Sequence, residues 1–119
     1  MTVQPVWIFQ PNEEEYWLEP VAKGAAFLDE KHPEWATKIN ISKLLMQHGH
    51  ACILGQLYGQ YDLGAVAVGL RNKDDQYRTT PLEDELGFHT TFTGRMPDHI
   101  AWTWLRRLWI AEVRKRTAA

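Results

Sequence analysis

Residues 50–70, HACILGQLYGQYDLGAVAVGL, contain no lysine or arginine and a single acid, Asp62. Apolar residues recur in the first half of this stretch at the spacing of one helix face: Ile53, Leu54, Leu57 and Tyr58. Gly59 is well placed to end that helix, because glycine adopts a left-handed conformation without a Cβ clash. The stretch therefore predicts a short helix that ends at Gly59.

A second helix is predicted after Gly59, with Asp62 as the capping residue that accepts a hydrogen bond from its first turn. Its buried stripe is expected to hold four apolar residues: Leu63, Val66, Ala67 and Leu70. Small residues are frequent throughout the stretch: Gly55, Gly64, Ala65 and Ala67. Each interior glycine costs about 1 kcal/mol of helix propensity, so we expect close packing against another helix to hold the segment.

Two short buried strands, over residues 51–54 and 65–70, are the alternative for this stretch, because brief apolar runs do not separate the two periods cleanly. Gln56 and Gln60 lie one helical turn apart and give the first segment a polar side. A strand buried on both faces would lack such a side, so we prefer the helices.

The rest of the chain also predicts helices, and the fold class is a small all-α bundle of about five short helices. Asn12 and the acids after it start a turn over residues 13–18 that Pro20 stops, and Pro20 begins a second helix that runs to about Glu30. Residues 71–76 are polar without periodicity and predict a solvated loop. Thr80, Pro81 and Gly87 mark the cap, the first residue and the end of another short helix.

The clearest helix is predicted from Pro97 or Asp98 to about Arg116. One stripe of it is apolar and is expected to face the core: Trp102, Leu105, Trp109 and Val113. The opposite side holds Thr103, Arg106, Ile110 and Arg114. Ile110 is the one apolar residue on that side and is framed by arginines, which makes it a candidate for contact with a partner, although an ordinary lone surface isoleucine is the more common case.

Residues 1–12 predict an extended N-terminal arm, and residues 13–119 a single helical domain. Pro5 and Pro11 bracket the apolar run of residues 6–9, and proline disfavours helix in the residue before it. Trp7 and Phe9 are expected to be covered, since exposed apolar segments of this kind are aggregation hazards. Docking on their own domain is favoured about two to one over a partner or a second copy, so a homodimer stays open.

Composition places this 119-residue chain among single domains that bury a core without disulfides or structural metal. One cysteine cannot form an internal bridge, and the N-terminus has no basic start or long apolar run, so we expect a cytoplasmic protein with no membrane segment. Residues 1–98 carry 14 acids and 8 bases, whereas residues 99–119 carry 1 acid and 5 bases. Positive charge is therefore concentrated at the C-terminal end.

Catalysis and metal binding are not expected. His48, His50 and Cys52 have donor atoms suited to zinc, but a structural zinc site needs four ligands, and the other histidines are scattered singly. Cys52 begins an apolar run, where burial keeps a thiol neutral and inert. No nucleophile elbow, phosphate-binding glycine loop or paired-acid site is evident. The sequence therefore predicts no enzyme, no cofactor and no metal site.

The runs FLDEKHPEW (residues 27–35) and CILGQLYG (residues 52–59), with Tyr61 and Gly64, resemble a group of small uncharacterised proteins encoded by actinobacteria and their phages. The resemblance covers roughly residues 24–112 and brings no catalytic residues. Relatives often have a second cysteine where His50 stands, so a shared redox or metal role does not carry over. The resemblance implies a phage or prophage origin.

The favoured function is a phage-type accessory protein, an interaction module that binds and modulates a host or phage protein. Its partner-binding residues are predicted to be apolar anchors and arginines: Trp7, Phe9, Trp17, Arg106, Arg107, Ile110 and Arg114. The alternative is a nucleic-acid-binding regulator that uses the basic C-terminal helix. The acids elsewhere in the chain would repel phosphate unless they face away, which makes this alternative the less favoured one.

Overall fold

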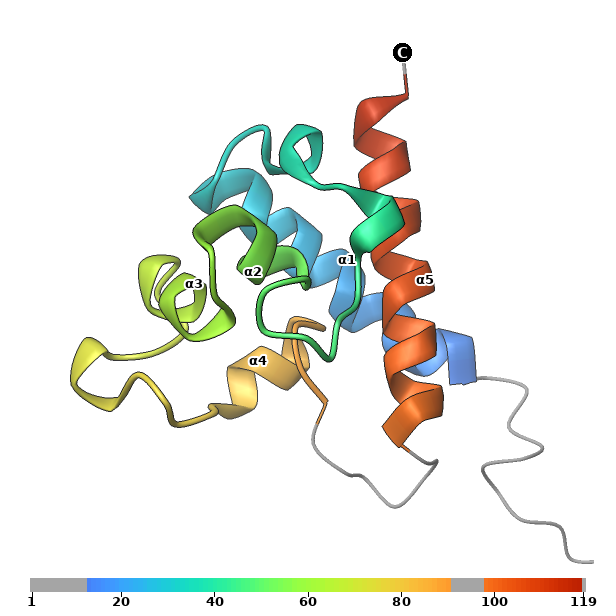
Figure 1. Ribbon diagram of the computed structural model, residues 1–119. Helices are drawn as coiled ribbons and strands as arrows, with labels where there is room; N and C mark the ends of the chain where they lie inside the picture. Colours follow the sequence, from blue (N-terminus) through green and yellow to red (C-terminus); the bar gives the residue numbers. More distant parts are fainter. Residues whose placement is uncertain (1–12, 91–97, 119) are drawn as a thin grey trace, which may run out of the picture.

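The computed structural model describes residues 13–90 and 98–118, and these residues form an all-α domain without strands (Figure 1). Its elements are five α-helices and three 3₁₀ turns: α1 (Glu13–Lys31), η1 (Trp35–Lys38), η2 (Ile41–Lys43), α2 (Ile53–Tyr58), α3 (Tyr61–Ala67), η3 (Lys73–Asp75), α4 (Pro81–Glu85) and α5 (Asp98–Thr117). The predicted fold class is therefore confirmed. The predicted arm, residues 1–12, lies outside the described residues.

Helix α1 runs without a break through Pro20, so the prediction of two elements divided at that proline is wrong. Trp17 and Val21 lie one turn apart on either side of Pro20, and both are buried in the same core. A break would turn one of them away from that core. Their burial offsets the roughly 3 kcal/mol that an interior proline costs a helix.

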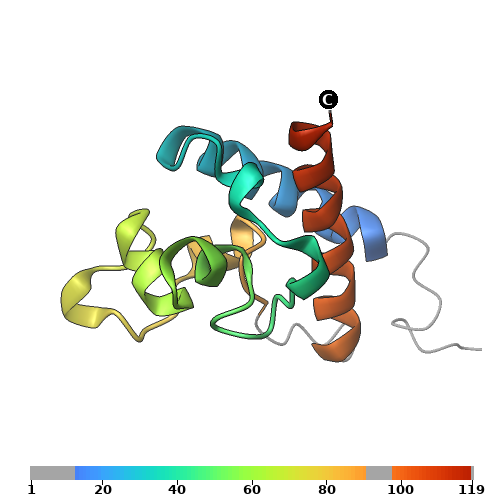
Figure 2. The ribbon, with the colours of Figure 1, turned by 45° about the horizontal axis from the view of Figure 1, so that its top comes forward.

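The two long helices, α1 and α5, cross each other, and both contribute buried residues to the core (Figures 1 and 2). Trp109 of α5 lies at the centre of the crossing, where it is stacked on Phe88 at 5.1 Å and meets Trp35 edge-on at 5.7 Å between ring centroids. Its indole N–H donates to the Gly87 carbonyl at 2.7 Å. The predicted apolar stripe of α5 thus faces the core, with Leu105, Trp109 and Val113 buried and Trp102 half-buried against them.

The central stretch folds into α2 and α3, which pack on each other, and Gly59 ends α2 with a φ of 89° as predicted. A Cβ at Gly64 would lie 2.9 Å from the Cβ of Leu54, so the predicted close approach through small residues is confirmed. The predicted stripe of α3 is partly wrong. Leu63 and Ala67 are exposed, because the Gly64 contact turns the face holding Gly64, Ala65 and Val68 inward.

The caps of the short elements divide into confirmed and corrected predictions. Helix α4 begins at Pro81 with a capping box between Thr80 and Glu83, as its sequence predicts. Asp62 does not cap α3, because that helix begins one residue earlier, at Tyr61, and the Asp62 carboxylate binds an arginine instead. The turn η2 is capped by the Asn40 side chain, which accepts from the Ser42 amide.

Candidate functional site

The outward side of α5 carries the predicted partner-binding residues of the C-terminal helix. Arg106, Arg107, Ile110 and Arg114 come together with Ile41 and Ser42 of η2 around a depression of about 380 Å³. The two isoleucines are half-buried, while Arg107 and Arg114 are exposed. The predicted residues of α5 therefore lie in one place, and the fold adds an apolar contribution from a segment more than sixty positions away.

A second depression, of about 330 Å³, adjoins the first along α5 and shares Arg106 and Arg107 with it. Its remaining lining comes from the N-terminal half of α5 and the segment after η2: Leu45, Gln47, Trp102 and Thr103. We call the two depressions together the arginine face. The arginine face thus combines guanidinium groups with apolar side chains, two isoleucines in the first depression and Leu45 and Trp102 in the second.

Arg106 has a structural part in the arginine face. Its Nε donates to the Leu44 carbonyl at 2.7 Å, and its Nη2 lies 3.4 Å from the Ile41 carbonyl. These bonds hold η2 and the segment after it against α5. The guanidinium charge remains, because carbonyl oxygens do not neutralise it.

Arg107 and Arg114 are the more accessible cations of the arginine face. The Arg107 guanidinium lies over the Trp104 ring, 5.2 Å from its centroid. Within residues 13–90 and 98–118, no carboxylate forms an ion pair with Arg106, Arg107 or Arg114. Among the described residues, the positive charges of these three arginines are thus not balanced by a carboxylate.

The other cations at the end of α5 are engaged within the molecule. Arg116 binds Asp29 of α1 at 2.8 Å and Glu112 at 2.6 Å, and its guanidinium lies over the Trp35 ring. Lys115 pairs with Glu112 at 3.3 Å. The continuous basic stripe that the nucleic-acid hypothesis needs is therefore reduced, and the remaining positive charge is concentrated at the arginine face.

The other predicted partner-binding residues are three aromatic side chains that do not belong to α5. Trp7 and Phe9 lie outside the described residues. Trp17 is only 3% exposed and packs in the core, so it is corrected from a partner-binding residue to a core residue. It occupies the side of α1 that faces α5, where its large ring contributes to the shared core.

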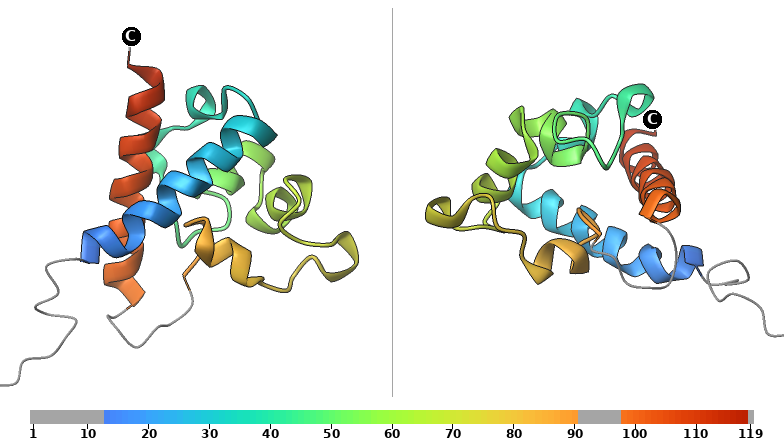
Figure 3. Two further views of the ribbon diagram at one scale, coloured as in Figure 1. Left: turned by 180° about the vertical axis from the view of Figure 1, so that it is seen from behind. Right: turned by 60° about the horizontal axis from the view of Figure 1, so that its bottom comes forward.

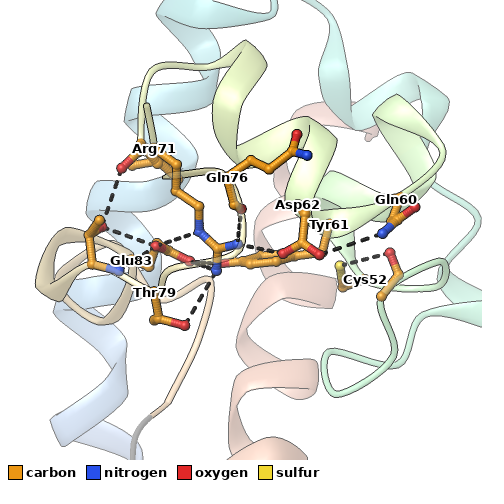
Figure 4. A network of polar contacts seen from close by, with 11 residues as sticks. Cys52, Gln60, Tyr61, Asp62, Arg71, Gln76, Thr79 and Glu83 are labelled. Atoms are coloured by element: carbon orange, nitrogen blue, oxygen red, sulfur yellow. Dashed lines mark hydrogen bonds and ion pairs between the residues drawn. The ribbon is translucent and has the colours of Figure 1, made fainter. Parts of the chain in front are cut away.

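A buried ionic cluster lies between α3 and α4, apart from the arginine face (Figure 4). This cluster is not predicted from the sequence. Arg71 donates from Nε to Glu83 Oε2 at 3.0 Å and from Nη2 to Glu83 Oε1 at 2.7 Å, and its Nη1 binds Asp62. Tyr61 donates its hydroxyl to Glu83 at 2.5 Å, and the Thr80 amide donates to the same carboxylate at 2.6 Å. We call these residues the Arg71 cluster.

The Arg71 cluster has the electrostatics of a structural network. Burial alone would raise the pKa of Glu83, but the hydrogen bonds from Arg71 and Tyr61 outweigh it and keep that pKa below its ordinary value. Burial and the bond to Glu83 raise the pKa of the Tyr61 hydroxyl. Glu83 is thus a carboxylate whose two oxygens are both bound, and Tyr61 keeps its proton. Neither is poised to exchange a proton with a substrate.

Two of the residues considered for metal or nucleophilic chemistry, His50 and Cys52, have structural contacts. Cys52 is buried and caps α2 by accepting the Gly55 amide at 3.3 Å, and burial raises the pKa of its thiol to about 11. His50 binds the Gly59 carbonyl through Nδ1 at 2.7 Å. Across the described ranges, no three His, Cys, Asp or Glu side chains are grouped to hold a metal ion.

The chain was compared with known families, proteins and structures. No protein-family model, curated protein or solved structure matches it. Within the part of the chain that the structure describes, no helix has the length and apolar character needed to cross a membrane.

Proposed function

We propose that this chain is a protein-interaction module whose arginine face binds an acidic segment of a partner. The observation that supports this most directly is the pair of adjoining depressions centred on Arg106 and Arg107. Guanidinium groups select carboxylates, and half-buried aliphatic and aromatic side chains supply contact area. The matching ligand is a peptide segment in which acids alternate with aliphatic or aromatic residues.

Binding is favoured over catalysis because the residues with reactive groups are engaged in structural contacts. The Cys52 thiol, with a pKa of about 11, is protonated at neutral pH, whereas the nucleophile is the thiolate. The resemblance to actinobacterial and phage proteins supports a more specific role, an accessory factor that modulates a host or phage protein in the cytoplasm. The partner in this proposal is a protein, and the nucleic-acid-binding regulator is the alternative outcome of the test.

The test is selection of binding peptides from a random displayed library on the immobilised full chain. Arg107→Glu with Arg114→Glu reverses two exposed charges without touching the bonds from Arg106 to η2. The selected peptides should be rich in Asp and Glu next to apolar residues, and they should bind the variant at least about tenfold more weakly. Fluorescence anisotropy of a labelled peptide measures the change.

The matched control is Lys73→Glu with Arg78→Glu, which makes the same change in net charge at exposed positions on another part of the surface. It should leave peptide affinity within about twofold. Equal loss in both variants, or selected peptides without acids, would overturn the proposal. If no peptide is selected but a DNA oligonucleotide binds with an affinity that falls steeply with salt, the regulator is supported instead.

A further inference from the structure

Helices α1 and α4 lie next to each other (Figure 3, left), and a groove between them shares no lining residue with the arginine face or the Arg71 cluster. Its volume is about 790 Å³, and residues of both helices line it: Tyr16, Glu19, Pro20, Lys23, Leu82, Glu85 and Leu86. Tyr16 is 37% exposed and Leu82 is 40% exposed. Exposed apolar side chains of this kind, set among charged ones, are typical of a binding surface.

The groove has a fixed floor because α1 and the end of α4 approach closely beside it. A Cβ on Gly24 would lie 1.9 Å from the Leu86 carbonyl oxygen, and a Cβ on Gly87 would lie 2.9 Å from the Val21 backbone. Glycine is needed at both positions for this approach. The groove itself lies toward the start of α1, where Tyr16 and Pro20 line it together with Leu82 of α4.

The segment that precedes α1 has the composition and the length to fill this groove. Residues 1–12 contain no charged side chain, and residues 6–9 are Val-Trp-Ile-Phe. Helix α1 rises about 10 Å from Tyr16 to Lys23. The linker of residues 10–12 lets residue 9 lie up to about 13 Å from Glu13, the first residue of α1, so residues 6–9 can reach the groove.

The charge of the groove favours this segment over the acidic partner of the arginine face. Glu19 and Lys23 neutralise each other at 2.9 Å, and Glu85 adds an acid at the edge. An acidic peptide would be repelled, whereas an uncharged apolar segment would not. Attachment to α1 also gives residues 6–9 a high effective concentration, about millimolar for a short linker, which a second copy reaches only at high protein concentration.

An independent observation at the start of α1 points the same way. The indole N–H of Trp17 is buried, and no acceptor for it is found among the described residues. Trp17 lies edge-on to Tyr16, which lines the groove, with 4.7 Å between the ring centroids. A backbone carbonyl from the preceding segment would satisfy this donor, whose burial without a partner costs about 1–3 kcal/mol.

We propose that residues 6–9 occupy the groove between α1 and α4 of the same molecule. Trp7 and Phe9 then belong to the core-covering part of the fold, and partner binding is left to the arginine face. The segment adds an apolar cover to a pair of helices that would otherwise expose Tyr16 and Leu82.

Disulfide trapping in the full chain tests this proposal, because the natural Cys52 is buried and its raised pKa keeps it unreactive. Ile8→Cys is combined with Glu85→Cys in the groove or, as a control, with Ala67→Cys on the exposed side of α3. Mild oxidation should join the first pair within one chain at least about tenfold faster than the second. Non-reducing electrophoresis and peptide mass spectrometry identify the link.

A second substitution in the same experiment separates groove binding from chance encounters. Leu82→Glu places a charge in the groove and should slow the trapping of the first pair at least about tenfold. Leu63→Glu, at an exposed leucine of α3, should leave the rate unchanged. Equal rates in the two pairs, or insensitivity to Leu82→Glu, would overturn the proposal, and so would links formed mainly between two chains.

This outcome is distinguishable from failure of the proposed function. Leu82→Glu leaves every residue of the arginine face in place, so binding of the selected acidic peptide should stay within about twofold of wild type. Loss of peptide binding with intact trapping would count against the arginine face alone. Loss of trapping with intact peptide binding would count against the groove alone.

Discussion

At the residue scale, Glu83 is the acid on which the Arg71 cluster depends, since it is fully buried and receives bonds from Arg71, Tyr61 and Thr80. Glu83→Gln keeps the shape and removes the charge, so Arg71 stays buried with only Asp62 to balance it. We expect the free energy of unfolding to fall by about 3 kcal/mol, measured by urea denaturation. Glu85→Gln, on the exposed side of the same helix, should change it by less than about 0.5 kcal/mol. Equal effects would contradict the structural role of the cluster.

The Arg71 cluster also marks where prediction from the sequence ends. Arg71 opens a polar run without periodicity, which predicts a solvated loop, and the rest of the run is indeed largely exposed. Glu83 fits the capping box that the sequence shows, but its second set of bonds joins residues twelve and twenty-two positions apart. No local pattern encodes pairs at such separations.

For Arg106 of the arginine face, too, the sequence predicts the position on the helix but not the bonds to distant residues. Its place on the side of the last helix opposite the buried stripe follows from helical periodicity, and there the structure holds it half-buried against η2. Its bonds to the Leu44 and Ile41 carbonyls depend on where η2 lies in space, which periodicity does not give. A test that reversed the charge of Arg106 would therefore disturb the fold together with the face.

At the scale of elements, Gly24 shows that helix packing overrides local preference. Gly24→Ala in the interior of α1 should add about 1 kcal/mol of stability by propensity alone. The new methyl group would instead overlap the Leu86 carbonyl and force α4 away from α1. We expect a net loss of about 1–3 kcal/mol by urea denaturation. Gly49→Ala is the control and should be tolerated, because no atom lies within 4 Å of a Cβ placed on Gly49. A Gly24→Ala variant more stable than wild type would contradict the close contact between α1 and Leu86.

Helix ends and helix interiors differ in how well the sequence predicts them. Gly59 and the Thr80–Glu83 box act through their own neighbours along the chain, so their predictions hold. Pro20 fails as a stop signal, because Trp17 and Val21 must both reach one core. The buried side of α3 was misassigned because it is chosen by contact with α2, and several of its small residues suit either side.

At the scale of the whole molecule, acid should weaken the fold. The hydrogen bond to Arg116 lowers the pKa of Asp29 below 3.8, and the Arg71 cluster keeps that of Glu83 below 4.5. Folded carboxyls with lowered pKa values bind protons less readily than unfolded ones, so their stabilisation is complete above about pH 5 and is lost as the pH falls through those values. Urea midpoints measured from about pH 7 down to about pH 3 should decline below about pH 4.5.

Comparison with Glu83→Gln isolates the buried carboxylate in this acid transition. Because the variant lacks the group that titrates, the stability difference from wild type should shrink on acidification. A difference that stays constant from neutral to acid conditions would show that Glu83 is not a source of the pH dependence. The Asp29–Arg116 pair is partly exposed, so its share should also fall with added salt.

The crossing of α1 and α5 joins the earliest and the latest helices of the described chain, with α2, α3 and α4 between them. Because these two helices are far apart in sequence, the chain must close a long loop, at a cost in entropy, before their side chains can make contact. During synthesis, the apolar side of α1 therefore leaves the ribosome long before Trp109 and Leu105 exist to cover it. Until α5 has emerged from the exit tunnel, the nascent chain is a natural client for chaperones that shield hydrophobic surface.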